Sequence, residues 1–223
     1  MEIRENSWIF VEQRIRVHFS KTEAMRYTGH LDLQRAWERL LRRADLPTVY
    51  SQGYNPRPRI QLAAALPLGF TSQAEVVDFW LESRYEIPDL QARLEAAAPP
   101  GIRIQRVEEI PEEERRAPAL QSVMQSAEYD VTLLEPVTDL EERVAALLQA
   151  ERLPRVRRKK QYDLRPLVYA LSIQSPDESG HQRLYMHLSA RESATGRPEE
   201  VLDALGIPPH LARVHRTALH YQT

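Results

Sequence analysis

Hydrophobic and polar residues alternate along Gln13–Ser20. This period of two, carried by β-branched and aromatic residues, predicts a strand with one buried face. In Leu31–Ala44 the period changes, because apolar residues recur three or four positions apart, as on one face of a helix. Thr28 or Gly29 is the expected N-cap of this helix. We expect the buried face of the helix to consist of Leu33, Ala36, Trp37, Leu40, Leu41 and Ala44.

The rest of the first half contains further apolar segments. Strands are expected over Ile60–Leu66, Glu75–Leu81 and Ile102–Val107, with a helix over Leu90–Ala98 and a short strand at Val49–Ser51. The order strand, helix, paired strands, helix, strand is that of the ferredoxin-like, or split βαβ, plan.

The same order of elements recurs after an acidic segment, Glu108–Pro118, that we interpret as a linker. The sequence thus predicts an α+β fold of two tandem ferredoxin-like (βαββαβ) units with antiparallel sheets, over residues 12–110 and 127–222. The second unit carries a basic segment. Its expected strands are Tyr129–Leu134, Gln161–Ile173, Leu184–Ala190 and Val214–His220, and its helices are Asp139–Ala150 and Pro198–Leu205.

Composition narrows the classes of function. The chain has 223 residues, 30 basic and 32 acidic side chains and no cysteine. A uniformly basic nucleic-acid coat protein is excluded, as are disulfides, thiol nucleophiles and cysteine-held clusters. No apolar run is long enough to cross a bilayer, and the start of the chain lacks a signal-peptide pattern. These features favour a soluble cytoplasmic protein that does not associate with membranes. Neither of the common glycine-rich nucleotide-binding loops occurs in the sequence, nor does an H-E-x-x-H zinc motif.

Positive charge is concentrated in two segments although the whole chain has a net charge of -2. Arg14–Ile60 contains ten basic and four acidic residues, and Glu151–Pro166 contains seven basic and two acidic residues. Clustered basic charge is the usual footprint of polyanion binding, although a solvated basic loop has the same composition. Our candidate binding residues in the second segment are Arg157, Arg158, Lys159, Lys160 and Arg165.

A stiff, polar, proline-rich loop lies between the first helix and the next strand of the first half. Aromatic rings stack on bases, and arginine contacts phosphate through two parallel hydrogen bonds. An ordinary Gly/Pro hairpin loop is the alternative. The candidate binding residues of this loop are Tyr50, Gln52, Tyr54, Asn55, Arg57 and Arg59.

The start of the first helix is the third candidate site. His30 and Asp32 lie in its first turn, where exposed backbone amides and the helix dipole favour an anion. A local structural role for His30 is the alternative. If the protein is an enzyme, His30 is the expected acid/base, with Tyr27 nearby. No metal site is predicted, because His215 and His220 are five positions apart and would face opposite sides of a regular strand.

Five segments carry a resemblance to a known family. They resemble the radical SAM-linked protein family, an uncharacterised bacterial domain found fused to radical SAM proteins or encoded beside them. The tandem plan is also similar in architecture to CRISPR repeat-processing endoribonucleases, but Pro208–Tyr221 lacks the glycine-rich loop of those enzymes. The five segments are Phe19–Leu33, Arg43–Pro47, Tyr50–Ile60, Ala65–Gly69 and Lys159–Leu167.

The resemblance implies a radical SAM partner rather than a reaction of this chain. A radical SAM cluster needs three cysteines, so the iron–sulfur cluster and S-adenosylmethionine are expected on the partner, with no cofactor here. The leading hypothesis is a non-catalytic RNA-binding or substrate-presenting partner in RNA modification. A metal-independent endoribonuclease that uses His30 is one alternative. A protein–protein adaptor that docks through Gly53–Arg59 is the other.

Overall fold

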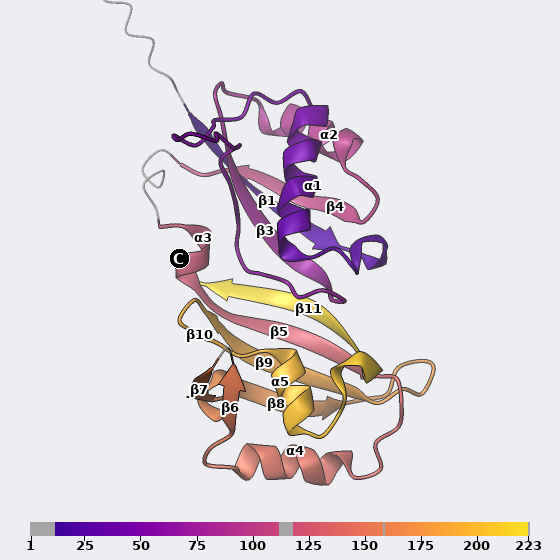
Figure 1. The fold of residues 1–223 in the computed structure, drawn as a ribbon. Helices are drawn as coiled ribbons and strands as arrows, with labels where there is room; N and C mark the ends of the chain where they lie inside the picture. The colour runs from indigo at the N-terminus through magenta and orange to yellow at the C-terminus, as the bar shows by residue number, and fades with distance from the viewer. Residues whose placement is uncertain (1–11, 112–117, 158, 223) are drawn as a thin grey trace, which may run out of the picture.

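The computed structural model describes residues 12–111, 118–157 and 159–222 (Figure 1). Within these residues the fold is mixed α+β, with five α-helices and a large, mostly antiparallel sheet. The nine-stranded sheet has the order β10-β9-β5-β11-β3-β1-β4, with β2 paired to β3 and β8 paired to β9. One sheet therefore extends through both halves of the chain.

The first half builds its core between α1, α2 and one face of the sheet. The expected strand and helix at the start of the chain are confirmed, and Leu33, Trp37, Leu40 and Leu41 are buried on α1. They pack against the alternate residues Ile15, Val17 and Phe19 of β1. The elements of this half are β1 (Gln13–Lys21), α1 (His30–Arg43), β2 (Ile60–Leu62), β3 (Thr71–Leu81), α2 (Ile87–Ala97) and β4 (Ile102–Glu109).

The second half has its own core, in which apolar residues of α4 and α5 pack against β5, β8, β9 and β11. A two-stranded hairpin, β6–β7, is separate from the large sheet. The elements are α3 (Leu120–Val123), β5 (Met124–Leu133), α4 (Leu140–Gln149), β6 (Pro154–Arg157), β7 (Lys160–Asp163), β8 (Val168–Gln174), β9 (Arg183–Arg191), β10 (Ala194–Thr195), α5 (Pro198–Ala204) and β11 (Ala212–Tyr221).

The last strand joins the two halves. β11 pairs with β5 antiparallel and with the start of β3 in parallel, where His215 lies opposite Thr71 and Arg216 opposite Ser72. Leu66, from the segment before β3, also belongs to the core of the second half. The junction is thus made of both backbone hydrogen bonds and apolar packing, which places β3 and β11 side by side (Figure 1).

Several boundaries differ from those expected. Gln161–Ile173 is not one strand, because a 3₁₀ turn at Arg165–Leu167 separates β7 from β8. The strand expected at Ile60–Leu66 ends at Leu62. Val49–Ser51 contributes only an isolated bridge, from Tyr50 to Pro58. Pro166 lies in the turn between β7 and β8 and explains that break, since proline removes a backbone donor from a ladder.

A β-bulge in β11 corrects the expected orientation of its two histidines. The pairing of β11 with β5 shifts between Arg216 and Ala218, which adds one residue to β11. His215 lies opposite Asp130, and His220 lies opposite Ser126. Asp130 and Ser126 are four residues apart on a regular stretch of β5 and so share a face. The expectation that the two histidines face opposite sides is therefore wrong.

Among the described residues, no helix combines the length and the apolar character that a membrane span requires. This agrees with the absence of a long apolar run in the sequence.

Candidate functional site

A pocket of about 410 Å³ lies where the two halves meet. Its walls come from the first turn of α1, the segment 63–68 that leads from β2, the start of α5 and the junction strand β11. Residues from both ends of the chain thus face one cavity. The polar side chains that the argument uses are His30, Tyr129, Arg197 and Arg216.

Arg216 supplies positive charge to this pocket. Its side chain is 2% exposed, and Nη1 donates to the Glu75 carboxylate at 2.8 Å while Nη2 donates to the carbonyl of Ala65 at 2.8 Å. The guanidinium also lies 5.6 Å from the ring of Tyr129. Burial disfavours its charge, but Glu75 and Tyr129 outweigh that effect and raise the pKa of Arg216. Nε is buried without a hydrogen-bond partner among the described residues.

His30 faces the same pocket from the first position of α1. Gly29 is the N-cap and has no side chain that could accept a hydrogen bond. The backbone N–H groups of the first turn are therefore available to another acceptor. Nδ1 of His30 is buried and finds no partner in the described part of the chain. Burial lowers the pKa of His30, with Glu75 opposing and Arg216 adding to the effect. The ring is therefore neutral at pH 7 and offers one donor and one acceptor.

Lys21 interacts electrostatically with Glu75 and Arg216. Its side chain is fully buried, and Nζ donates to the carbonyls of Phe70 and Arg26 at 2.8 and 3.2 Å. Burial lowers the pKa of Lys21 from 10.5 to about 8, with Glu75 opposing the shift and Arg216 adding to it. One carboxylate, Glu75, therefore faces two buried cations.

The lowered pKa of Lys21 predicts a pH-dependent stability. Below pH 8 the amine is charged in both states, and its burial cost is fully present. Because the unfolded chain holds the proton up to pH 10.5, stability relative to a Lys21→Met variant should rise by about 2 kcal/mol between pH 8 and pH 10. Urea unfolding of both proteins at the two pH values measures this. A difference that stays constant with pH would contradict the lowered pKa.

The proline-rich loop forms a projecting hairpin. The backbone amide of Ser51 donates to the carbonyl of Arg57, and that of Arg59 donates to the carbonyl of Val49. Arg59 stacks on Trp80 with 4.0 Å between the guanidinium carbon and the ring centroid. The expected binding residues of this loop are all exposed, and they are Tyr50, Gln52, Tyr54, Asn55, Arg57 and Arg59.

The β6–β7 hairpin presents the second set of expected residues. Lys159 and Lys160 are exposed and Arg157 is half-buried, while Arg158 lies outside the described residues. Arg165 has a different environment, because its guanidinium donates to the carbonyls of Val168 and Leu148 at 3.1 and 3.0 Å. Those bonds tie the turn before β8 to the end of α4.

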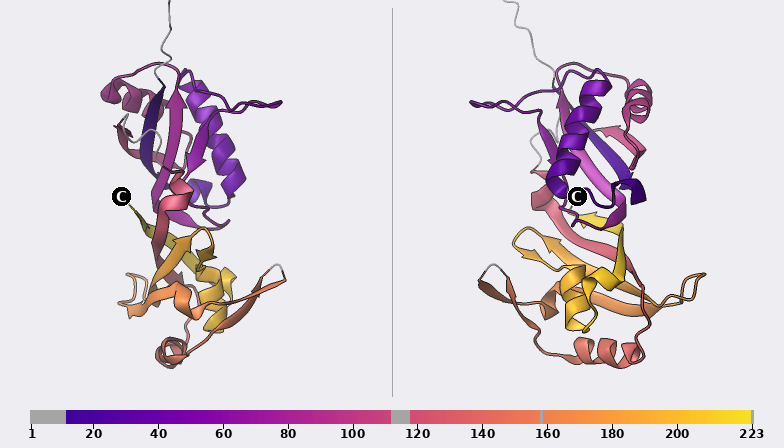
Figure 2. Two further views of the ribbon diagram at one scale, coloured as in Figure 1. Left: turned by 90° about the vertical axis from the view of Figure 1, so that its left-hand side faces the viewer. Right: turned by 45° about the vertical axis from the view of Figure 1, so that its right-hand side comes forward.

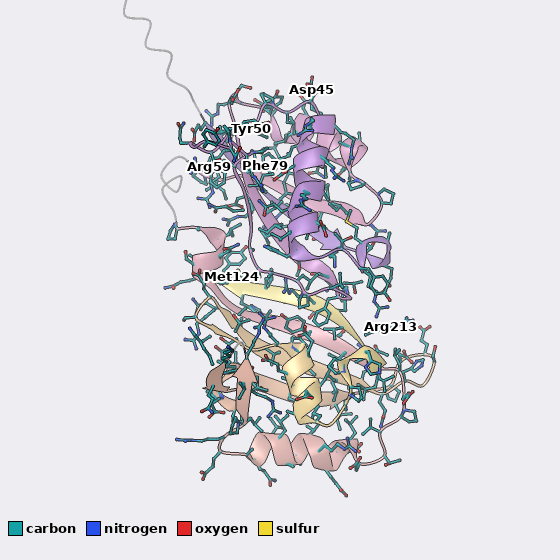
Figure 3. The ribbon with its side chains drawn as sticks, in the orientation of Figure 1. Asp45, Tyr50, Arg59, Phe79, Met124 and Arg213 are labelled. Atoms are coloured by element: carbon teal, nitrogen blue, oxygen red, sulfur yellow. The ribbon has the colours of Figure 1, made fainter. Side chains whose placement is uncertain are left out.

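Both hairpins project to the same side of the molecule, one from each half (Figure 2). Figure 3 labels Tyr50 and Arg59 near the base of the first hairpin. In the left view of Figure 2, the helices α1 and α5, whose first residues line the pocket, lie on the side to which the hairpins project. The structure therefore groups His30 with the two basic hairpins along one side of the molecule.

Two other expected residues lie apart from the pocket. Asp32 is exposed and pairs with Arg35 on the next turn of α1 at 3.1 Å. Tyr27 is 76% exposed and lies beside the guanidinium of Arg26. Neither residue lines the cavity that contains His30.

Three residues of the cluster were missed in the sequence, namely Lys21, Glu75 and Arg216. Lys21 and Arg216 lie in segments where apolar and polar residues alternate, and each takes a position on the apolar face. A charged residue at such a position could have indicated a buried polar group. Glu75 comes at the start of an apolar segment, so the sequence suggests an exposed residue at the beginning of a strand. Their pairing depends on strands that are more than one hundred residues apart in the chain, because Arg216 is on β11 and Glu75 on β3.

A family model described as an uncharacterized protein conserved in bacteria (DUF2344) matches residues 14–198. The chain belongs to this family. The match includes both hairpins, Lys21, His30 and Glu75, whereas Arg216 lies beyond it. A comparison with curated proteins finds no match.

Comparison with solved structures finds DyP-type peroxidases at low similarity. The encapsulated enzyme from Mycobacterium smegmatis is 12% identical, with 91% of this chain and 89% of that chain covered and a TM-score of 0.23. A variant of DypB from Rhodococcus jostii RHA1 in complex with heme is 10% identical, with 91% and 90% covered and a TM-score of 0.21. TM-scores of this size carry no argument about fold or activity.

Proposed function

We propose that the protein is a non-catalytic RNA-binding subunit that presents a substrate to a radical SAM enzyme in the cytoplasm. The observation that carries the proposal is the projection of two hairpins to one side of the molecule (Figure 2). Both hairpins have exposed cations, and the first also has the exposed tyrosines Tyr50 and Tyr54. RNA is recognised through phosphate contacts by cations and through stacking of unpaired bases on aromatic rings.

Arg59 stacks on Trp80 and pairs with Glu12 at 3.2 Å, whereas four other described cations of the hairpins lack an ion pair. Within the described residues, Arg57, Arg157, Lys159 and Lys160 form no ion pair. Tyr54 is fully exposed at the tip of its hairpin, so its ring is free for a base. Because exposed cations contribute little to stability, their concentration on two projections is better explained by binding.

The pocket provides a site for one phosphate of the bound RNA. The uncapped first turn of α1 directs backbone amides and the positive end of the helix dipole toward the cavity. Arg216, with its unpartnered Nε, is a second and independent donor. The carboxylate of Glu75 neutralises Arg216, and the lining residues Glu192 and Arg197 carry opposite charges, so net attraction depends on the helix terminus.

The radical SAM partner is inferred from the motif resemblance. Phe19–Leu33 and Ala65–Gly69 contribute to the pocket. Tyr50–Ile60 forms the first hairpin, and Lys159–Leu167 includes β7 of the second. The segments that carry the resemblance therefore coincide with the proposed RNA side. With no cysteine in this chain, the iron–sulfur cluster and S-adenosylmethionine belong to the partner.

We also propose that each half is a ferredoxin-like unit. The strand order β4-β1-β3-β2 in the first half and β11-β5-β9-β8 in the second both support this interpretation. All pairs within these two sets are antiparallel. Since βαββαβ units have the order 4-1-3-2, the parallel β3–β11 contact would join two such units edge to edge.

Replacing Arg157, Lys159 and Lys160 together by glutamine should weaken binding to a fluorescein-labelled, single-stranded RNA of mixed sequence. Each phosphate contact contributes a log–log salt slope of about -0.7 on single strands, so the slope should become shallower by about 2. Fluorescence anisotropy over a series of KCl concentrations measures affinity and slope together.

A matched control changes the same charge on another surface. Arg93 on α2 and Arg103 and Arg106 on β4 are exposed, and these two elements lie on the side of the molecule away from the hairpins (Figure 2), so their replacement by glutamine should leave the affinity and slope nearly unchanged. Equal loss in both triple variants would indicate only a general charge effect. If neither triple variant changes RNA affinity and a pull-down from native lysate returns a cysteine-rich radical SAM protein without enriched RNA, the adaptor alternative would replace this proposal.

Replacing His30 by glutamine separates binding from catalysis. As a phosphate-binding donor, His30 should contribute about 1–2 kcal/mol to RNA affinity. As a general acid or base, its loss would instead lower a cleavage rate by about 10²–10⁴-fold while sparing affinity. RNA cleavage by the wild type in excess chelator, lost in this variant with binding retained, would identify a ribonuclease.

A further inference from the structure

The face of β5, β9 and β11 opposite the second core carries a row of polar side chains. Tyr129, Val131 and Met186 belong to the core that packs against α4 and α5, so the alternate residues of the same strands point the other way. Glu128 and His187 are directly opposite each other on that outer face. This face lies away from the core formed with α4 and α5, and it plays no part in the proposed binding of RNA.

The bulge in β11 brings a third ligand to this pair. His220 lies opposite Ser126, which is two residues from Glu128 on the same face of β5. Without the extra residue at position 217, His220 would point into the apolar layer. A glutamate and two histidines from three neighbouring strands therefore meet, with one ligand atom from each within 4.8 Å of the others.

The contacts around the three side chains hold them in place. Glu128 Oε1 lies 2.6 Å from His220 Nε2, and His187 Nε2 lies 2.8 Å from Ser126 Oγ. The His187 and His220 rings are 5.4 Å apart between centroids, and the ring of Tyr169 meets His187 edge-on. The side chains of Glu128 and His220 are 26% and 48% exposed, so an ion can reach them from solvent.

Two neighbouring side chains, His220 and Tyr185, form hydrogen bonds with the Glu128 carboxylate. Burial alone raises the pKa of Glu128, but hydrogen bonds from His220 and Tyr185 outweigh it, and the pKa is lowered. A hydroxyl that donates to a ligating carboxylate is the kind of outer contact that orients metal ligands in proteins. The cluster thus combines one carboxylate, two imidazoles and an orienting tyrosine.

We propose that Glu128, His187 and His220 form a binding site for a divalent zinc ion with one position open to water. Two histidines and a glutamate are an established zinc donor set, and three protein ligands leave the fourth tetrahedral position free. Imidazole nitrogen with carboxylate oxygen favours zinc over the hard ions magnesium and calcium, which take oxygen ligands.

Metal binding needs only side-chain adjustment. Zinc bonds of about 2.0–2.2 Å place tetrahedral ligand atoms about 3.3 Å apart. The 2.6 Å Glu128–His220 hydrogen bond must therefore open slightly, and the wider pairs within the 4.8 Å limit must close. The ion takes the place of the hydrogen bond between Glu128 and His220, so Nε2 of His220 must bind it without a hydrogen.

The test is a titration of chelator-treated, full-length protein with Zn²⁺ by calorimetry and with Co²⁺ by visible absorption. We expect one ion per chain and a four-coordinate Co²⁺ spectrum. His187→Gln and His220→Gln should each lower affinity by at least about 100-fold. Tyr185→Phe, which removes an outer contact, should cost about 10–100-fold.

His181→Gln is the matched control, because His181 forms a His–carboxylate pair with Asp177 at 3.2 Å but is not part of this cluster. It should retain full affinity and the same Co²⁺ spectrum. Circular dichroism confirms the fold of each variant, and His220, near the exposed end of β11, is the substitution least costly to folding. Absence of binding at micromolar Zn²⁺ would overturn the proposal. The same holds for affinity that is unchanged in both cluster variants, or lost equally in His181→Gln.

Discussion

Replacing Trp37 by alanine should lower the free energy of unfolding by about 3–5 kcal/mol, as large-to-small substitutions of buried aromatic residues do. The indole extends from α1 toward β1 and is fully buried. It meets the ring of Phe19 edge-on, with 4.9 Å between the ring centroids. Its Nε1 has no partner among the described residues, so the loss is one of apolar packing and not of a hydrogen bond. Urea unfolding followed by circular dichroism measures the change.

Leu31 on the same helix is the control for this substitution. Its side chain is 68% exposed, so Leu31→Ala should change stability by less than about 0.5 kcal/mol. A cost below about 1 kcal/mol for Trp37→Ala would mean that the buried face of α1 is assigned incorrectly. Equal costs for the two substitutions would indicate an effect on helix propensity alone.

Replacing Glu75 by glutamine should also destabilise the protein by about 3–5 kcal/mol, the range observed when one member of a buried ion pair is removed. Glu75 and Arg216 are each 2% exposed and 2.8 Å apart. Their pairing connects β3 to β11, and Glu75 also offsets the charge of Lys21. The neutral amide leaves two buried cations without a counter-charge, and the junction between the halves should be affected first.

Two further variants identify the cause of that loss. Asp32→Asn removes an exposed ion pair with Arg35 and should cost less than about 1 kcal/mol. Combining Glu75→Leu with Arg216→Met removes both members of the pair, but it also removes the charge that offsets Lys21. It should therefore recover part of the stability, because apolar replacements of a buried pair are often neutral. If the double variant is as unstable as Glu75→Gln, packing around β3 and not uncompensated charge is responsible.

The pocket and the stability of the junction depend on the same groups. Arg216 contributes to the cavity wall while it pairs with Glu75 and bonds the carbonyl of Ala65. Substituting Arg216 therefore tests binding and folding at once. His30 is the better probe of the pocket, because its Nδ1 has no partner among the described residues and its replacement breaks no hydrogen bond at that atom.

Local pattern was enough to predict most of the helices and strands. Five elements were expected within a few residues of their observed bounds, namely β1, α1, α4, α5 and β9. Each of them buries one face, and the spacing of its apolar residues in the sequence identifies that face. The buried face of α1 was correct at Leu33, Trp37, Leu40 and Leu41. The exposed hairpin with Tyr54 was also evident, since proline and glycine specify turns through their own backbone limits.

Pairing between distant strands could not be read from the sequence. The parallel contact of β3 with β11 and the ion pair between Glu75 and Arg216 connect residues that are more than one hundred positions apart. Their proximity depends on sheet order, and no local period encodes that order. A single charged residue in a strand looks the same in sequence whether it faces solvent or a buried partner.

The β-bulge at position 217 is the clearest example of a feature that the sequence did not reveal. Side chains in a strand alternate strictly, so one extra residue reverses the face of every residue after it. The spacing of His215 and His220 alone therefore gave the wrong side for one of them. The sequence by itself determined the elements, their amphipathic faces and the two basic segments, because these follow from neighbours along the chain. Only the tertiary structure decided the shared sheet, the pocket with His30 and Arg216, and the Glu128–His187–His220 cluster, because each depends on register between strands that meet only when the chain folds.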